Sequence, residues 1–394
     1  LGWPPRMPTP GRFFGGDGDD TLFAAHEVFG GPGDDVVTGV RLARGGAGDD
    51  AQVLVRVAFA GGDADGVPAS ALGGPGDDAH VRARVDVDLD GSAPAEALAR
   101  PVAVARGGAG DDGVVASLDL VSAGAAAPPS RHLVAAFGGP GDDAVRASIL
   151  SDPTAGDVAD GTYLVVAYGQ AGDDTVTAAT RLSAGFGGPG DDRLLGTATD
   201  APGPWDVGDL FGGPGDDVVR GAGRARGGDG DDRLGGSSYH DSTLFGGAGN
   251  DTLTGSNATD TGAGSRLSAD FLFGGAGDDV LFGFWRRDVL NGGPGDDTLY
   301  GGFPIADPTA DVHVFRGDFG ADRVHGFTTV MQRLGHDRLI LDADGEAETF
   351  ESFLAATVQQ GEDAVYDLGD DGVNVITLVD VERDAIRPEQ IDFA

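Results

Sequence analysis

A glycine–aspartate hexapeptide recurs along most of this chain and limits what the chain can fold into. Gly-Gly-x-Gly-Asp-Asp occurs thirteen times among the 394 residues, and eleven occurrences are without deviation. Gln170 replaces the second glycine once, and Asn250 replaces the first aspartate once. The occurrences begin at Gly15, Gly30, Gly45, Gly73, Gly107, Gly138, Gly169, Gly187, Gly212, Gly227, Gly246, Gly274 and Gly292.

The composition of the hexapeptide indicates a site for a hard cation. Three glycines in four positions permit positive φ angles and leave no Cβ atoms in the way. Such a turn can direct several carbonyl oxygens at one point, and the two aspartates add carboxylate oxygens. Oxygen ligands of these kinds suit Ca²⁺ better than zinc or copper. Apolar residues that follow the turn, such as Val218 and Val219, predict a short strand leaving it.

The segment Gly212–Arg220 resembles the glycine-rich nonapeptide of RTX proteins at all nine positions. The resemblance covers roughly residues 13–300. It implies a parallel β-roll with Ca²⁺ between successive turns, usually in a row on each of two edges. The implied ligands are backbone carbonyls and the sixth-position aspartates. These aspartates are Asp20, Asp35, Asp50, Asp78, Asp112, Asp143, Asp174, Asp192, Asp217, Asp232, Asp251, Asp279 and Asp297. The clearest glycines to supply carbonyls are Gly212, Gly213, Gly215, Gly274, Gly275, Gly277, Gly292, Gly293 and Gly295.

The spacing of the hexapeptides departs from that of the family. Tandem nonapeptides would place successive motifs nine residues apart, whereas here the starts are 15 to 34 residues apart. We therefore expect one calcium turn per coil, a variable loop on the opposite edge, and mainly one row of calcium sites. Coils around residues 78–168 should be wide, and those around 187–246 narrow. The expected fold is all-β: a parallel β-roll, or β-helix solenoid, with coils of variable width and a small α+β cap at its C-terminal end.

Changes in composition predict three segments. Residues 1–12 are expected to be a linker or an N-terminal extension, residues 13–302 the glycine-rich calcium-binding roll, and residues 303–394 a cap. The last segment is similar to the C-terminal region of RTX proteins, which closes the roll and carries a type I secretion signal. The similarity is carried by Phe319-Gly320-Ala321-Asp322 and by Ile391-Asp392-Phe393-Ala394.

The pattern within the cap predicts its elements. Helical spacing of apolar residues favours a helix over 347–360, and two strands are expected over 364–368 and 373–379. A last helical turn is expected over 387–390, because proline lies near its start. The side chains expected to cover the last coil are Phe315, Phe327, Ile340 and Leu341.

The net charge limits the partners of the chain. A formal charge of −39 argues against nucleic acid or an anionic membrane as a partner. If about 12 Ca²⁺ lie between thirteen stacked turns, the charge becomes roughly −15. No apolar run approaches the length of a membrane span, and the absence of cysteine excludes disulfides and thiolate metal sites.

Catalytic motifs are absent from the sequence. His26-Glu27 begins like a zincin motif, but Gly30 stands where the second histidine is needed. The chain has no Gly-x-Ser-x-Gly and, without lysine, no Walker A sequence. We therefore expect no enzymatic activity in this segment and assign no catalytic residue.

Two local clusters have alternative interpretations. The stretch from Asp86 to Gly91 resembles the start of an EF-hand loop, or is polar alternation on a strand that enters a loop. The Trp285-Arg286-Arg287 cluster could stack on a sugar or bind an acidic polymer, although packing of Trp285 over a coil is favoured.

Three functional hypotheses follow. We favour a secreted bacterial calcium-binding β-roll that folds on binding Ca²⁺ outside the cell, uses type I secretion machinery and acts as a scaffold or in surface interaction. The chain could instead be the C-terminal module of a larger secreted protease, lipase or polysaccharide-modifying enzyme. The third hypothesis is a carbohydrate-binding or adhesive solenoid whose partners are glycans or a cell surface.

Overall fold

The computed structural model forms two compact units, Leu1–Pro189 and Gly190–Ala394, called here the first and the second unit. The described residues are 11–60, 69–89, 102–122, 132–151, 163–179, 183–196, 208–237, 241–256, 269–284, 287–302, 310–329, 336–342, 349–369 and 372–393.

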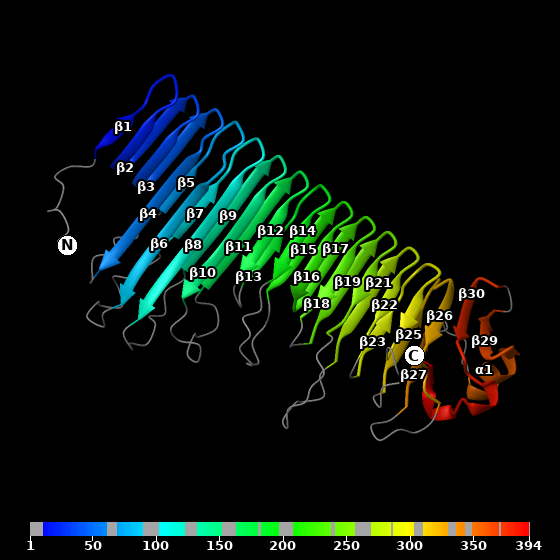
Figure 1. Cartoon of the computed structure of the whole chain (residues 1–394). Coiled ribbons are helices and arrows are strands. Elements are labelled where there is room, and N and C mark those ends of the chain that lie inside the picture. The colour runs from blue at the N-terminus through cyan, green and yellow to red at the C-terminus, as the bar shows by residue number, and fades with distance from the viewer. Residues whose placement is uncertain are drawn as a thin grey trace. The chain divides into compact units, whose positions relative to one another are not determined.

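The first unit is built from parallel strands in its described residues (Figure 1). After β1, β2 and β3, the strands pair in two series, β4–β6–β8–β10–β12 and β5–β7–β9–β11–β13. The hexapeptide turns that begin at Gly73, Gly107, Gly138 and Gly169 each join a strand of the second series to a strand of the first. The strands are β1 (Arg12–Phe14), β2 (Thr21–Pro32), β3 (Val36–Ala47), β4 (Gln52–Ala60), β5 (Ala69–Leu72), β6 (Val81–Leu89), β7 (Val102–Arg106), β8 (Gly113–Ser122), β9 (His132–Pro140), β10 (Ala144–Ser151), β11 (Tyr163–Ala171), β12 (Thr175–Ala179) and β13 (Ser183–Phe186).

The strands of the first unit form because apolar and polar residues alternate, so every second side chain faces inward. In-register pairing stacks equivalent inward residues of successive coils on one another. The resulting column is Val37, Val53, Val81, Val114, Val145 and Val176, each at most 1% exposed. Small β-branched side chains therefore fill a thin core.

The second unit continues the same plan within itself. Its parallel series are β14–β16–β18–β20–β22–β24–β26–β30 and β15–β17–β19–β21–β23–β25–β27–β31. Its strands are β14 (Arg193–Gly196), β15 (Asp209–Pro214), β16 (Val218–Ala222), β17 (Arg224–Asp229), β18 (Arg233–Gly236), β19 (Thr243–Ala248), β20 (Thr252–Thr254), β21 (Phe271–Ala276), β22 (Val280–Phe282), β23 (Val289–Asn291), β24 (Thr298–Tyr300), β25 (Val312–Arg316), β26 (Ala321–His325), β27 (Arg338–Asp342), β28 (Thr357–Gln360), β29 (Asp363–Leu368), β30 (Asn374–Leu378) and β31 (Ile391–Phe393).

Leucine replaces valine in the core of the second unit. One in-register column contains Leu234, Leu253, Leu281 and Leu299, each at most 2% exposed. The fold therefore confirms the all-β parallel roll. It also confirms the variation in coil width, because β6, β8 and β10 have eight to ten residues whereas β14, β16, β18 and β20 have three to five.

The C-terminal cap contains helix α1 (Phe350–Ala356), the antiparallel strands β28, β29 and β30, and the 3-10 helices η1 (Arg383–Ala385) and η2 (Pro388–Gln390). The two strands and the last helical turn confirm the sequence-based prediction. The predicted helix over 347–360 is too long, because α1 ends at Ala356. Residues 357–360 gain antiparallel pairing with β29, which leaves Val358 55% exposed on a strand.

Three of the four predicted cap residues are buried: Phe315, Phe327 and Leu341 are at most 5% exposed. The prediction for Ile340 is wrong, since it is only partly buried and Leu339 faces the core. Strand β27 pairs in register with β25, and the two-residue period then places 339 and 341 inside.

Candidate metal centre

The hexapeptide turn depends on glycine for steric reasons. Gly213 and Gly215 have φ angles of 140° and 134°, a region that residues with a side chain rarely adopt. A methyl group placed on Gly215 would overlap the carbonyl oxygen of Gly190 in the preceding coil. Close stacking of the turns therefore requires these glycines.

One oxygen of each sixth-position aspartate links two successive coils. The backbone N–H of Asp192 donates to Oδ1 of Asp217 at 2.8 Å, and the N–H of Asp217 donates to Oδ1 of Asp232 at 2.8 Å. We call the row of hexapeptide turns in each unit the glycine–aspartate edge. In the first unit its sixth-position aspartates are Asp20, Asp35, Asp50, Asp78, Asp112, Asp143 and Asp174. In the second unit they are Asp192, Asp217, Asp232, Asp251, Asp279 and Asp297, and Asp322 takes the equivalent place in the turn that follows.

The other oxygen, Oδ2, points inward and has no hydrogen-bond partner at eleven of these aspartates. A Cβ atom at Gly212 would overlap Oδ2 of Asp217, so this oxygen lies against the first glycine of its own turn. A buried carboxylate oxygen without a partner is costly unless a cation compensates it. The eleven are Asp35, Asp50, Asp78, Asp112, Asp143, Asp217, Asp232, Asp251, Asp279, Asp297 and Asp322.

The electrostatics of the edge also favour a cation. The pKa of Asp217 is raised to about 7: burial is the largest cause, the nearby carboxylates of Asp191 and Asp216 add to it, and a backbone hydrogen bond from Asp192 opposes it. Burial likewise raises the pKa of Asp232 and of Asp279 to about 8. Without compensating positive charge, these groups resist ionisation at neutral pH.

The glycines predicted as ligands lie at the same edge. A Cβ at Gly228 would overlap the carbonyl oxygen of Gly213, and a Cβ at Gly230 would overlap that of Gly215. The carbonyls of Gly275 and Gly277 face the next coil in the same way, against Gly293 and Gly295. The first glycines, Gly212, Gly274 and Gly292, lie against Oδ2 of the aspartate of their own turn.

These residues fit Ca²⁺. Carbonyl and carboxylate oxygens at one edge are the donor set that Ca²⁺ prefers. The Oδ2 atoms and the glycine carbonyls would hold the ion, which would supply the positive charge that the buried carboxylates lack. Within the described residues, no three Asp, Glu or His side chains gather in a cluster suited to a metal ion.

The first aspartate of each pair forms a separate and exposed row. The N–H of Asp231 donates to Oδ1 of Asp216 at 2.8 Å, and the N–H of Asp278 donates to Oδ1 of Asn250 at 2.8 Å. An asparagine serves this row as well as an aspartate, because only one neutral acceptor oxygen is needed.

Asp322 extends the glycine–aspartate edge beyond the thirteen hexapeptides. The N–H of Asp297 donates to its Oδ1 at 2.8 Å, and burial raises the pKa of Asp322 to about 9. The hexapeptide motif missed this position as a ligand candidate because Asp318 replaces the second glycine and Ala321 replaces the first aspartate. The spacing of Gly320 before Asp322 was the available signal.

A second row of polar residues, which sequence reasoning also missed, lies on the opposite edge of the second unit. It contains Ser242, Asp270, Asp288, Asp311 and Asp337, and each N–H donates to the side-chain Oδ1 of the next member. We call it the second-edge row. Ser242, Asp270 and Asp288 each stand four residues before a hexapeptide, which is a signal too weak to find without the structure.

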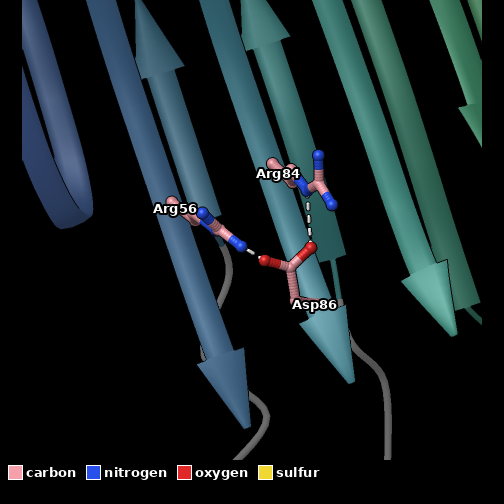
Figure 2. A network of polar contacts seen from close by, with 3 residues as sticks. All are labelled: Arg56, Arg84 and Asp86. Carbon is pink, nitrogen blue, oxygen red and sulfur yellow. Dashed lines mark hydrogen bonds and ion pairs between the residues drawn. The ribbon is translucent and has the colours of Figure 1, made fainter. Parts of the chain in front are cut away.

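Asp86 does not belong to a calcium loop. It lies on β6, where Arg56 Nε donates to Oδ2 at 2.6 Å and Arg84 Nε donates to Oδ1 at 2.5 Å (Figure 2). Burial alone would raise the pKa of Asp86, but the two arginines lower it below its ordinary value. The EF-hand hypothesis is therefore wrong at Asp86, and residues 90–91 lie outside the described residues.

Aromatic rings form stacks on the outer faces of the coils. The rings of Phe137 and Tyr168 are 5.1 Å apart and those of Tyr168 and Phe186 are 4.7 Å apart, nearly parallel in both pairs. Arg106 lies over Phe137 at 5.0 Å. Neighbouring coils thus cover the ring faces on which a sugar would stack. The predicted role of Trp285 lies outside the described residues.

Comparison with known sequences identifies the repeats. The family described as the RTX calcium-binding nonapeptide repeat (4 copies) matches at residues 12–25, 238–266, 267–283 and 282–303. The chain carries RTX repeats. The calcium-binding character of these repeats agrees with the buried carboxylate oxygens of the edge. No curated protein matches the chain.

Among solved structures, the extracellular lipase LipA from Serratia marcescens is similar to this chain, with 20% sequence identity and a TM-score of 0.27. The match covers 62% of this chain and 42% of the lipase chain. In the part of the chain that the structure describes, no helix is long and apolar enough to cross a membrane.

Proposed function

We propose that the chain is a secreted calcium-binding β-roll whose folding is coupled to Ca²⁺, and that it serves outside the bacterial cell as a scaffold or interaction surface. The observation that carries the proposal is the set of eleven buried Oδ2 atoms without partners at the glycine–aspartate edges of the two units. A folded array with these charges uncompensated is strained electrostatically, and Ca²⁺ would remove the strain.

The difference in free calcium concentration between the cytosol and the outside of the cell would determine where the chain folds. Extracellular calcium modules bind at about 10⁻⁴–10⁻³ M, far above the free calcium of cytosol. A ligand that binds only the folded state stabilises that state by mass action. The chain would therefore remain unfolded inside the cell, be exported by type I secretion machinery through its C-terminal segment, and fold outside.

The test is circular dichroism of the whole chain in chelator, then in millimolar Ca²⁺, then in millimolar Mg²⁺. We expect β signal only with Ca²⁺, because Mg²⁺ demands tight octahedral geometry and releases water reluctantly. A full β signature in chelator would overturn the coupling.

The other hypotheses gain little from the described residues. Within the stack of Phe137, Tyr168 and Phe186, the rings cover one another's faces, so this stack does not favour binding to a sugar. Whether a catalytic domain accompanies the roll in a longer protein is answered by the full reading frame.

A further inference from the structure

The carboxylates at the two edges of the second unit differ in their hydrogen-bond partners. At the glycine–aspartate edge, Oδ2 of Asp251 has no hydrogen-bond partner. In the second-edge row, both oxygens of Asp270 accept backbone hydrogen bonds. Ser242 N–H donates to Oδ1 at 2.6 Å and Ser256 N–H donates to Oδ2 at 2.6 Å.

Asp337 is held in the same way. The N–H of Asp311 donates to its Oδ1 at 2.9 Å, and the N–H of Thr328 donates to its Oδ2 at 2.7 Å. The side chain of Gln390, 0% exposed, donates to the carbonyl oxygens of Thr328 and Asp337 at 2.9 and 3.2 Å. Through Gln390, the cap thus bonds to both Thr328 and Asp337, the two residues that the Asp337 carboxylate links.

The backbone at these positions presents donors where a calcium site needs acceptors. Ser256 follows Gly255 directly, and Phe327 and Thr328 follow Gly326, so neither turn has the second and fourth glycines of the hexapeptide. Ca²⁺ takes about six to eight oxygen ligands. An N–H group carries partial positive charge and occupies the oxygen that a cation would need.

We infer that Asp270 and Asp337 are cation-free clasps, and that Ca²⁺ binds in the second unit at the glycine–aspartate edge rather than at these two positions. The inference rests on the proposed calcium binding of the first edge. It departs from the two-edged calcium arrangement that the RTX resemblance implies.

The clasps have a structural role of their own. Each carboxylate joins two positions of the chain that are distant in sequence, 14 positions apart for Ser256 and Asp270 and 9 apart for Thr328 and Asp337. The backbone of the coil therefore closes at the loop base without a metal ion. Hydrogen bonds from N–H to a buried carboxylate are charge-assisted and stronger than neutral ones.

The test compares matched variants of the whole chain in millimolar Ca²⁺. Asp251→Asn and Asp297→Asn alter the glycine–aspartate edge, whereas Asp270→Asn and Asp337→Asn alter the clasps. Bound calcium is counted by atomic emission after dialysis. We expect the first pair to lose at least one ion per chain, and the second pair to keep the wild-type count while the melting temperature falls by about 5 °C.

Equal loss of calcium from both pairs would overturn the inference but leave the proposed function intact. A wild-type chain that binds no calcium would overturn the proposed function instead. If a clasp variant does not fold, calcium anomalous scattering from wild-type crystals decides the question. Peaks only at the glycine–aspartate edge support the clasps, and a peak at Asp270 or Asp337 refutes them.

Discussion

Replacing Asp217 by asparagine should have opposite effects with and without calcium. The residue is fully buried, its Oδ1 accepts the Asp192 N–H, and its Oδ2 has no partner. Asparagine keeps an oxygen for Asp192 and removes the charge. The variant therefore separates the hydrogen-bonding role of the side chain from its electrostatic role.

In calcium the variant should be less stable than the wild-type chain. One site in 10 mM Ca²⁺ with a dissociation constant of about 10⁻⁴–10⁻³ M contributes about 1.5–3 kcal/mol. Asp217→Asn should lose about this much free energy of unfolding and at least one bound ion. Urea denaturation followed by circular dichroism gives the first quantity, and atomic emission gives the second.

In chelator the same variant should be more stable. With the pKa of Asp217 raised to about 7, ionisation at pH 8 costs the folded state about 4 kcal/mol, because each pKa unit is worth about 1.4 kcal/mol. Burial of an unpaired amide offsets about 1–3 kcal/mol of that gain. The remaining stabilisation is measurable in an osmolyte that favours the folded state. It should vanish near pH 4, where the aspartate is itself neutral.

Asp216→Asn is the matched control. Asp216 belongs to the exposed row, in which Asn250 already replaces an aspartate. Its stability should change by less than about 0.5 kcal/mol under both conditions. If Asp217→Asn and Asp216→Asn behave alike, with the same calcium count and no reversal of sign, the assignment of Oδ2 as a ligand is wrong.

Three further predictions concern other parts of the chain. Because these carboxyl groups hold their protons more tightly in the folded state than in the unfolded state, the calcium-free roll should be most stable near pH 4, lose stability as the pH rises above that, and complete the loss by about pH 6–9; a pH titration of circular dichroism in chelator checks this, and a transition in the opposite direction would contradict it. Gln170→Gly should stabilise the first unit by about 1 kcal/mol, since Gln170 has a φ of 95°, and urea denaturation in calcium should show the gain. Phe315→Ala should cost about 3–5 kcal/mol by opening a cavity under the cap, as thermal unfolding would reveal; an unchanged melting temperature would show that Phe315 is not part of the core.

The repeat itself made the fold and the glycine–aspartate edge predictable. Glycines at fixed positions impose one turn geometry, and thirteen repetitions of that turn leave a stacked roll as the consistent arrangement. The alternation of Val and Leu columns with exposed residues follows from the two-residue period of a strand. The positions of the glycines and the alternation of apolar residues, both visible in the sequence, thus determine most of the structure of the roll.

Features that depend on register or on distant partners could not be read in the same way. Ile340 and Leu339 are equally apolar, and only the pairing of β27 with β25 decides which faces inward. Asp270 and Asp337 follow loops of different lengths, so no constant spacing marks them. The end of helix α1 depends on pairing with β29, which lies beyond a turn.

The uneven intervals between hexapeptides have a consequence for how such a protein can change. Within a unit, each added turn lengthens the stack by one strand spacing of about 4.8 Å, however many residues separate it from the next turn. An insertion on the opposite edge enlarges one coil and leaves the stacking of turns unaltered, as the intervals of 15 and 34 residues show. The length of the stack in a unit can thus change by duplication of turns, and the size of a coil can change independently by insertion of residues between turns.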